Sequence, residues 1–123
     1  MATTIRADAA KNRMYIIFDG PIGEAESKAN LPIIDREVKK LAPGFSVITD
    51  TVRSRPTTIK VKEDIEAAQA ELLKHGLKRV VRVVGTNAVS AMQLDNGAKK
   101  TGYSGKVQVD TAATVAEAEK LLG

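Results

Sequence analysis

The chain has 123 residues, of which 43% are apolar and 28% charged, as is usual for one globular domain. It contains no cysteine and a single histidine, His75, which excludes disulfide scaffolds and thiol catalysis and argues against histidine-rich metal sites. No apolar run reaches the roughly 18 residues that a membrane helix needs, and the first residues lack a signal-peptide pattern. We therefore expect a cytoplasmic protein without membrane insertion.

The net charge of +4 is unevenly distributed. Residues 53–62 contain four basic residues and no acid, namely Arg53, Arg55, Lys60 and Lys62. Such a segment attracts an acidic partner or a phosphate group. Nucleic-acid binding usually adds stacking aromatic residues to a basic groove, whereas this chain has only 2 Tyr and 2 Phe. We therefore do not expect nucleic acid as a partner.

The first part of the chain predicts a hairpin. A short edge strand around Ile5 turns through Lys11 and Asn12 into residues 14–18. These five residues are apolar on both faces, which is typical of a buried strand, and residues 19–21 end it.

A helix is predicted next. Its apolar stripe has helical spacing and consists of Leu31, Ile34, Val38 and Leu41. Pro32 is expected near the start of this helix, where proline is tolerated, although residues 24–30 could add an earlier turn. The helix is expected to end at residues 42–44.

A second central strand is predicted at residues 45–49, ending at Asp50. A polar loop is expected over residues 51–58, followed by a short extended piece at Ile59 and Val61. A helix over residues 63–75 is predicted from its apolar stripe and from Gly76, which closes it.

The last part of the chain predicts two further strands and two helices. A valine-rich strand is expected at residues 78–84, a helix at 87–100, and a short strand at 106–109. Thr114 and Glu117 form a capping box for a final helix, which is expected to bury Val115, Ala118, Leu121 and Leu122.

This alternation predicts one α/β domain. Strands that alternate with helices form parallel pairs, while the first two strands pair as a hairpin. We expect a mixed, mostly parallel sheet of about four or five strands with about four helices.

The pattern resembles the STAS domain (sulfate transporter and anti-sigma-factor antagonist), especially its SpoIIAA-like branch. The resemblance lies in the order and spacing of elements across residues 1–123, read as one domain. It is carried by residues 45–50 (FSVITD), 72–76 (LLKHG), 79–85 (RVVRVVG) and 107–122. It implies a non-enzymatic module that binds a protein partner, without a cofactor.

The resemblance also implies a phosphorylation switch, because some members carry Asp-Ser-Ser-Gly before the second helix. This chain lacks that motif and has Thr51, Ser54, Thr57 and Thr58 in the matching loop. Ser54 is the best candidate phosphoacceptor. A phosphate there would meet a helix N-terminus and basic side chains, although these hydroxyls could equally cap the helix or form turns.

Other chemical interpretations are weaker. Asp19, Asp50 and Asp110 each end a predicted strand, where converging carboxylates could hold Mg²⁺, but aspartates at strand ends commonly start turns. The loop at residues 20–23 lacks the spacing of a nucleotide-binding motif. His75 is expected to stabilise the end of its helix when protonated. We therefore predict no catalytic residue and no metal ligand.

The sequence thus favours a regulatory or protein-interaction module. The predicted surface for a partner or phosphate extends to residue 64 and includes Arg53, Ser54, Arg55, Thr57 and Thr58. The partner is expected to be another protein or a second copy of this chain. The alternative is a carrier of a small molecule, lipid-like or nucleotide, with a pocket between helix and sheet.

Overall fold

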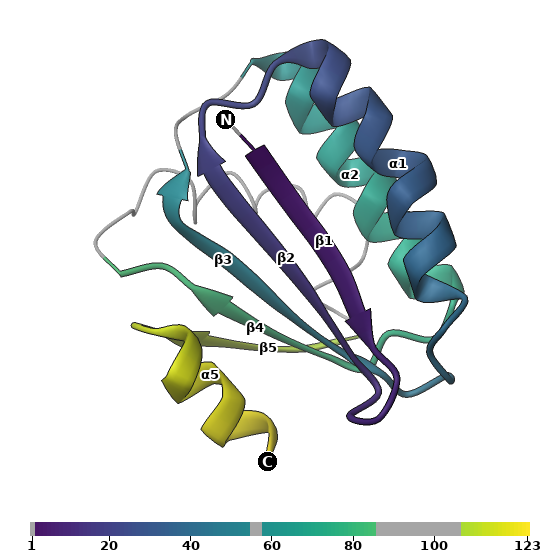
Figure 1. The fold of residues 1–123 in the computed structure, drawn as a ribbon, viewed down its shortest axis with the longest axis vertical. Helices are drawn as coiled ribbons and strands as arrows, with labels where there is room; N and C mark the ends of the chain where they lie inside the picture. The colour runs from purple at the N-terminus through teal and green to yellow at the C-terminus, as the bar shows by residue number, and fades with distance from the viewer. Residues whose placement is uncertain (1, 55–57, 86–106) are drawn as a thin grey trace.

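The computed structural model describes residues 2–54, 58–85 and 107–123 (Figure 1). In these ranges one sheet contains five strands in the order β1–β2–β3–β4–β5. The strands are β1 (Ala2–Asp8), β2 (Arg13–Gly20), β3 (Ser46–Ser54), β4 (Arg79–Val83) and β5 (Gln108–Ala112). The helices are α1 (Glu24–Val38), α2 (Ile59–Lys74) and α5 (Val115–Leu122).

The sheet is mixed and mostly parallel, as predicted. β1 pairs antiparallel with β2, and β2 to β5 pair in parallel. Three of the expected helices lie in the described ranges, and the helix expected over residues 87–100 lies outside them. None of the described helices is both long enough and apolar enough to cross a bilayer.

Helices cover both faces of the sheet. α1 and α2 lie side by side on one face, and α5 lies on the other (Figure 1). Successive residues of a strand point to opposite faces, so Met14 and Val47 pack under α1 and α2 while Tyr15 and Ile48 pack in the α5 cluster. This arrangement explains why the central strands are apolar on both faces.

The outer strand β1 is joined to α1 by two side chains. The backbone N–H of Thr3 donates to Glu26 Oε2 at 2.8 Å, and that of Ala7 donates to Glu37 Oε1 at 3.0 Å. The predicted turn into β2 is confirmed, with Asn12 at a φ of +52°. The Asn12 side chain accepts the N–H of Ala42 at 2.8 Å, which fixes the hairpin beside the end of α1.

The expected position of Pro32 is wrong. α1 begins at Glu24, directly after its N-cap Gly23, so Pro32 lies inside the helix. A proline removes one helical hydrogen bond, and Pro32 is exposed, so the position faces water. α1 also ends at Val38, which leaves Leu41 beyond the helix as a half-buried residue against the core.

The loop expected over residues 51–58 is also wrong in its first half. β3 continues to Ser54 because the end of β2 runs alongside it, with Asp19 opposite Arg53 and Gly20 opposite Ser54. Asp50 therefore lies within the strand rather than at its end.

Residues 59 and 61 are helical rather than extended. α2 begins at Ile59, after the N-cap Thr58, whose hydroxyl oxygen accepts the N–H of Val61 at 3.3 Å. The β-branched side chains of Ile59 and Val61 favour strand, but the cap and the burial of Val61 favour the helix.

The end of α2 follows the prediction. Gly76 has a φ of +95°, its N–H donates to the carbonyl of Leu73, and the N–H of Leu77 donates to that of Leu72. These two bonds form a Schellman motif.

At the end of the chain, α5 begins after the predicted cap Thr114, whose hydroxyl oxygen accepts the N–H of Glu117. Ala118 is buried, but Leu121 is 44% exposed, so its predicted burial is wrong. Asp110 lies within β5, because that strand extends to Ala112.

Candidate functional site

The predicted binding residues lie where β3 ends and α2 begins. We call Val52, Arg53, Thr58, Ile59, Lys60 and Lys62 the β3–α2 surface. Ser54 is the last residue of β3 and pairs with Gly20 in the sheet register. Arg55 and Thr57, also predicted for this site, lie outside the described residues.

Arg53 is the exposed cation of this surface at the end of β3. Its side chain is 78% exposed, and its Nε lies 3.3 Å from Asp19 Oδ1, on a carboxylate that is 51% exposed. Exposed ion pairs of this kind contribute about 0–1 kcal/mol, because water screens them. The guanidinium of Arg53 can therefore exchange Asp19 for another anion at little cost.

Two of the predicted hydroxyl residues have structural contacts. Thr51 is buried, and its hydroxyl donates to the carbonyl of Val83 at 2.9 Å. Thr58 is the N-cap of α2. Thr58 thus has the expected capping role, whereas Thr51 lies within β3 and bonds to the neighbouring strand instead of forming a turn. Arg53 is the exposed cation among these described residues.

The start of α2 is unusually positive. Helix N-termini carry a partial positive charge and usually attract acidic residues, but the first turn of α2 holds Lys60 and Lys62 and no acid. The buried carboxylate of Asp64 follows in the second turn, where its Oδ2 accepts the hydroxyl of Ser27. The charge of this helix end therefore favours an acidic ligand.

Apolar side chains are exposed on both sides of residues 53–58 in the sequence. Ile59 is 79% and Val52 42% exposed. Among the described residues, the exposed large hydrophobic side chains are these two and Leu121. In the sequence, Val52 comes just before Arg53, and Ile59 lies between Thr58 and Lys60. The exposure of Ile59 could not be predicted, because the sequence pattern predicts an extended piece at this residue.

A cavity of about 60 Å³ lies between the α1–α2 pair and the sheet. Most of its wall is apolar and comes from β1, β2, α1 and α2. Its buried polar lining residues are Ser27, Thr49, Asp64, Gln69 and Arg82. Since one water molecule occupies about 30 Å³ in the liquid, this space suits only a very small guest.

The three strand aspartates do not form the Mg²⁺ site that was considered. Asp19 contacts Arg53, the Oδ1 of Asp50 accepts the N–H of Val52 at 3.1 Å, and Asp110 lies 3.0 Å from Arg79. Each carboxylate has its own partner, and in the described part of the chain none belongs to a cluster with metal-ligand spacing.

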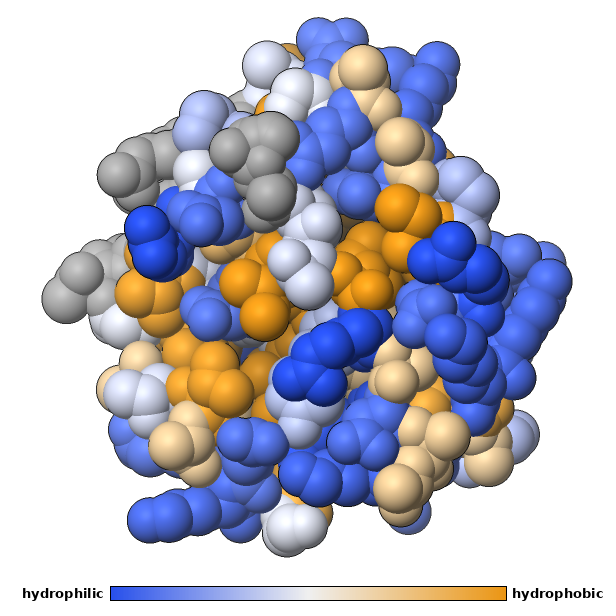
Figure 2. Space-filling model, in the orientation of Figure 1, coloured by the Kyte–Doolittle hydropathy of each residue, from blue (hydrophilic) through white to orange (hydrophobic). Residues whose placement is uncertain are grey.

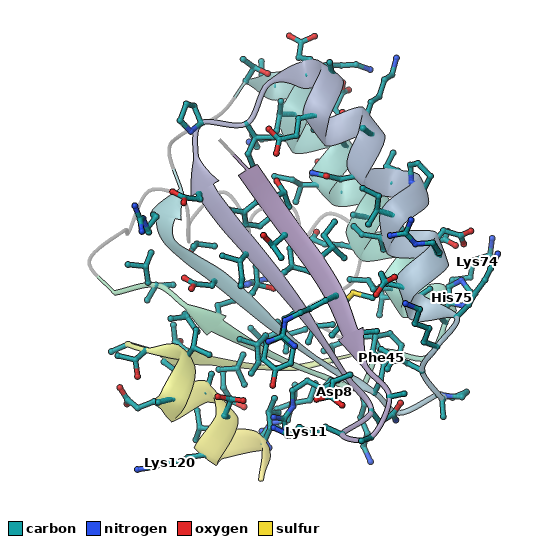
Figure 3. The ribbon with its side chains drawn as sticks, viewed as in Figure 1. Asp8, Lys11, Phe45, Lys74, His75 and Lys120 are labelled. Carbon is teal, nitrogen blue, oxygen red and sulfur yellow. The ribbon has the colours of Figure 1, made fainter. Side chains whose placement is uncertain are left out.

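His75 lies at the end of α2, close to the end of α1 (Figure 3). Its Nε2 is 3.1 Å from Glu71 Oε1 and 3.9 Å from Asp35 Oδ1. The spacing of Glu71 and His75 on one helix was visible in the sequence. Asp35 belongs to another helix, and only the packing of α1 against α2 brings it near.

Comparisons with known proteins find no match to any protein family and no significant match among curated proteins. The resemblance to the STAS domain therefore rests on element order and on the short stretches quoted above.

Proposed function

We propose that this protein is a non-catalytic interaction module whose β3–α2 surface binds an acidic segment of a protein partner. The observation that carries the proposal is the first turn of α2, which holds two lysines and no acid and begins with the exposed side chain of Ile59. Charged groups steer and orient a partner, whereas apolar groups supply most of the binding energy.

The exposure of Arg53 also supports this proposal. Arg53 has only a weak, exposed partner in Asp19, so its guanidinium is available to a carboxylate or phosphate. The apolar side chains in the middle of the face seen in Figure 2 lie over the sheet rather than at the start of α2, so they are not part of this surface. In a STAS-like regulatory module, phosphorylation of Ser54 would alter the charge of this same surface.

Peptide display on the immobilised protein tests the proposal. Selected peptides should be acidic and contain an apolar residue, and raising the salt concentration should weaken their binding. Fluorescence anisotropy would then compare the wild type with Arg53→Ala and Ile59→Ser. We expect each variant to bind about five- to tenfold more weakly, a loss of about 1 kcal/mol or slightly more.

Lys120→Ala is the matched control, because Lys120 is an exposed cation on α5 and lies away from the end of β3 (Figure 3). The Lys120→Ala variant should bind the selected peptides with the same affinity as the wild type. Selection of no peptide, or equal affinity in all four proteins, would contradict the proposal.

Carriage of a small molecule is the second candidate function, favoured by the cavity between the α1–α2 pair and the sheet. Pockets for drug-sized ligands typically measure about 300–1,000 Å³, so a lipid-like or nucleotide ligand would require α1 and α2 to move apart. Native mass spectrometry of protein purified from its own cells tests this function. A carrier should retain a ligand of defined mass, and Ala68→Phe, which narrows the cavity, should abolish that retention.

A further inference from the structure

We propose that Asp35, Glu71 and His75 form a binding site for a transition metal ion of the Zn²⁺ class. The site is separate from the β3–α2 surface and does not depend on the proposed function. It joins the last turn of α1 to the last turn of α2 through two carboxylates and one imidazole.

The distances suit such an ion. One oxygen from each carboxylate and one ring nitrogen of His75 lie within 4.8 Å of one another. Tetrahedral Zn²⁺ with bonds of about 2.0–2.2 Å requires its ligand atoms to be about 3.3–3.6 Å apart. The His75 nitrogen is already 3.1 Å from Glu71 and 3.9 Å from Asp35, so small side-chain rotations complete the geometry.

The imidazole decides which class of ion fits. Carboxylates alone suit Mg²⁺ and Ca²⁺, whereas an imidazole nitrogen beside carboxylates suits Zn²⁺ and its neighbours. Glu71 and His75 are four residues apart on α2, which places both side chains on one face of the helix. Asp35 adds the third ligand from α1, and three protein ligands leave one position for water.

The ends of two helices add a favourable field. β2, β3 and β4 are parallel, so the intervening helices α1 and α2 run in the same direction and their carboxyl ends lie together. Each carboxyl end bears a partial negative charge, which attracts a cation. The ammonium of Lys39 also lies in this field, with its Nζ 3.1 Å from Asp35 Oδ2. The other oxygen of Asp35, Oδ1, faces His75.

The backbone around the site is well fixed before any ion binds. His75 is the C-cap of α2, and its N–H donates to carbonyls of the last helical turn. The carbonyl of Gly76 then accepts the N–H of Gly44 at 2.8 Å, which joins the end of α2 to the segment after α1. Lys39 is 66% exposed and is therefore free to turn away from Asp35 when an ion enters.

Isothermal titration of Zn²⁺ into untagged, chelator-treated protein tests this site. We expect one ion per chain, with little or no binding of Mg²⁺. Asp35→Asn, Glu71→Gln and His75→Asn should each weaken Zn²⁺ binding about tenfold or more, since even losing an outer partner of a metal ligand typically costs about 10–100-fold. Glu63→Gln, which alters an exposed carboxylate at the other end of α2, is the matched control and should bind like the wild type.

A measurement on the wild type tests the same site without any substitution, so its result does not depend on whether a variant folds. His75 is the single histidine of the chain, so its imidazole gives one set of NMR signals. These signals should shift on adding one equivalent of Zn²⁺ and should broaden with Co²⁺. Absence of binding, unchanged imidazole signals, or equal affinity in the ligand variants and the control would each overturn the proposal.

Discussion

Gly76 illustrates how much one position contributes to this fold. Its φ of +95° is rarely adopted by side chains other than glycine, and a Cβ there would lie 2.9 Å from Cβ of Pro43. We expect Gly76→Ala to lower the free energy of unfolding by roughly 1–3 kcal/mol, because strain and a close contact coincide. Urea denaturation of the metal-free protein measures this loss.

Gly44 provides the comparison. It has a φ of +91°, but nothing lies within 4 Å of the position that a Cβ would occupy. Gly44→Ala should therefore cost less than Gly76→Ala, since it has the strain without the contact. Equal losses in the two variants would contradict the role assigned to Pro43.

Single residues could be predicted where the cause is local. Gly76 as the end of α2 and Thr114 as the start of α5 follow from short patterns, and the structure confirms both. The partners of Glu26 and Glu37 could not be predicted, because the N–H groups that they accept belong to a strand 23 and 30 residues away.

Among the elements, α1 depends on a buried charge. Glu37 is 5% exposed and accepts hydrogen bonds from Ala7 N–H, Lys40 and Arg36. The ammonium of Lys40 is the main reason why the pKa of Glu37 lies below its ordinary value of 4.5, and the Ala7 N–H is the next. The ionised form therefore stabilises the folded protein.

This lowered pKa predicts a stability that depends on pH. The stabilisation by ionised Glu37 is complete above about pH 4.5, the pKa of this carboxyl in the unfolded chain. It is lost as the pH falls through the lower pKa that Glu37 has in the folded protein. Glu37→Gln resembles the protonated form at every pH. Urea unfolding at a series of pH values should show the variant less stable near neutrality and the difference shrinking in acid. A difference that is independent of pH would refute this explanation, and Glu63→Gln serves as the control.

The elements were predicted well in kind and less well in length. The two-sided apolar runs identified β2, β3 and β4. The extension of β3 to Ser54 could not be predicted, because it depends on pairing with the end of β2 rather than on its own residues. The early start of α2 was missed because Ile59 and Val61 favour strand locally, whereas the structure satisfies the cap at Thr58.

At the scale of the whole molecule, the alternation of strands and helices predicted the mixed, mostly parallel sheet. The same alternation did not show that α5 would lie opposite α1 and α2. Contacts across the chain hold it there, including the bond from the Tyr15 hydroxyl to Glu119 at 2.8 Å. The guanidinium carbon of Arg6 lies over the ring of this tyrosine, 4.0 Å from the ring centre.

Each of the two proposed sites combines residues from two different elements, so neither could be predicted from one segment of the sequence. Asp35 meets Glu71 and His75 only because parallel crossovers bring two helix ends together. The β3–α2 surface likewise combines a strand end with a helix start, and its exposed Ile59 became recognisable only once the helix was known to begin there.

The glutamates that join α1 to β1 also bear on how copies of this protein can associate. An outer strand with free N–H groups is a template on which another chain can add a strand. Here Glu26 and Glu37 occupy two of those groups, so strand addition at β1 must first displace two carboxylates and leave them without their partners. These two hydrogen bonds from α1 therefore oppose the addition of a strand to β1. A homodimer would form more readily through a different surface.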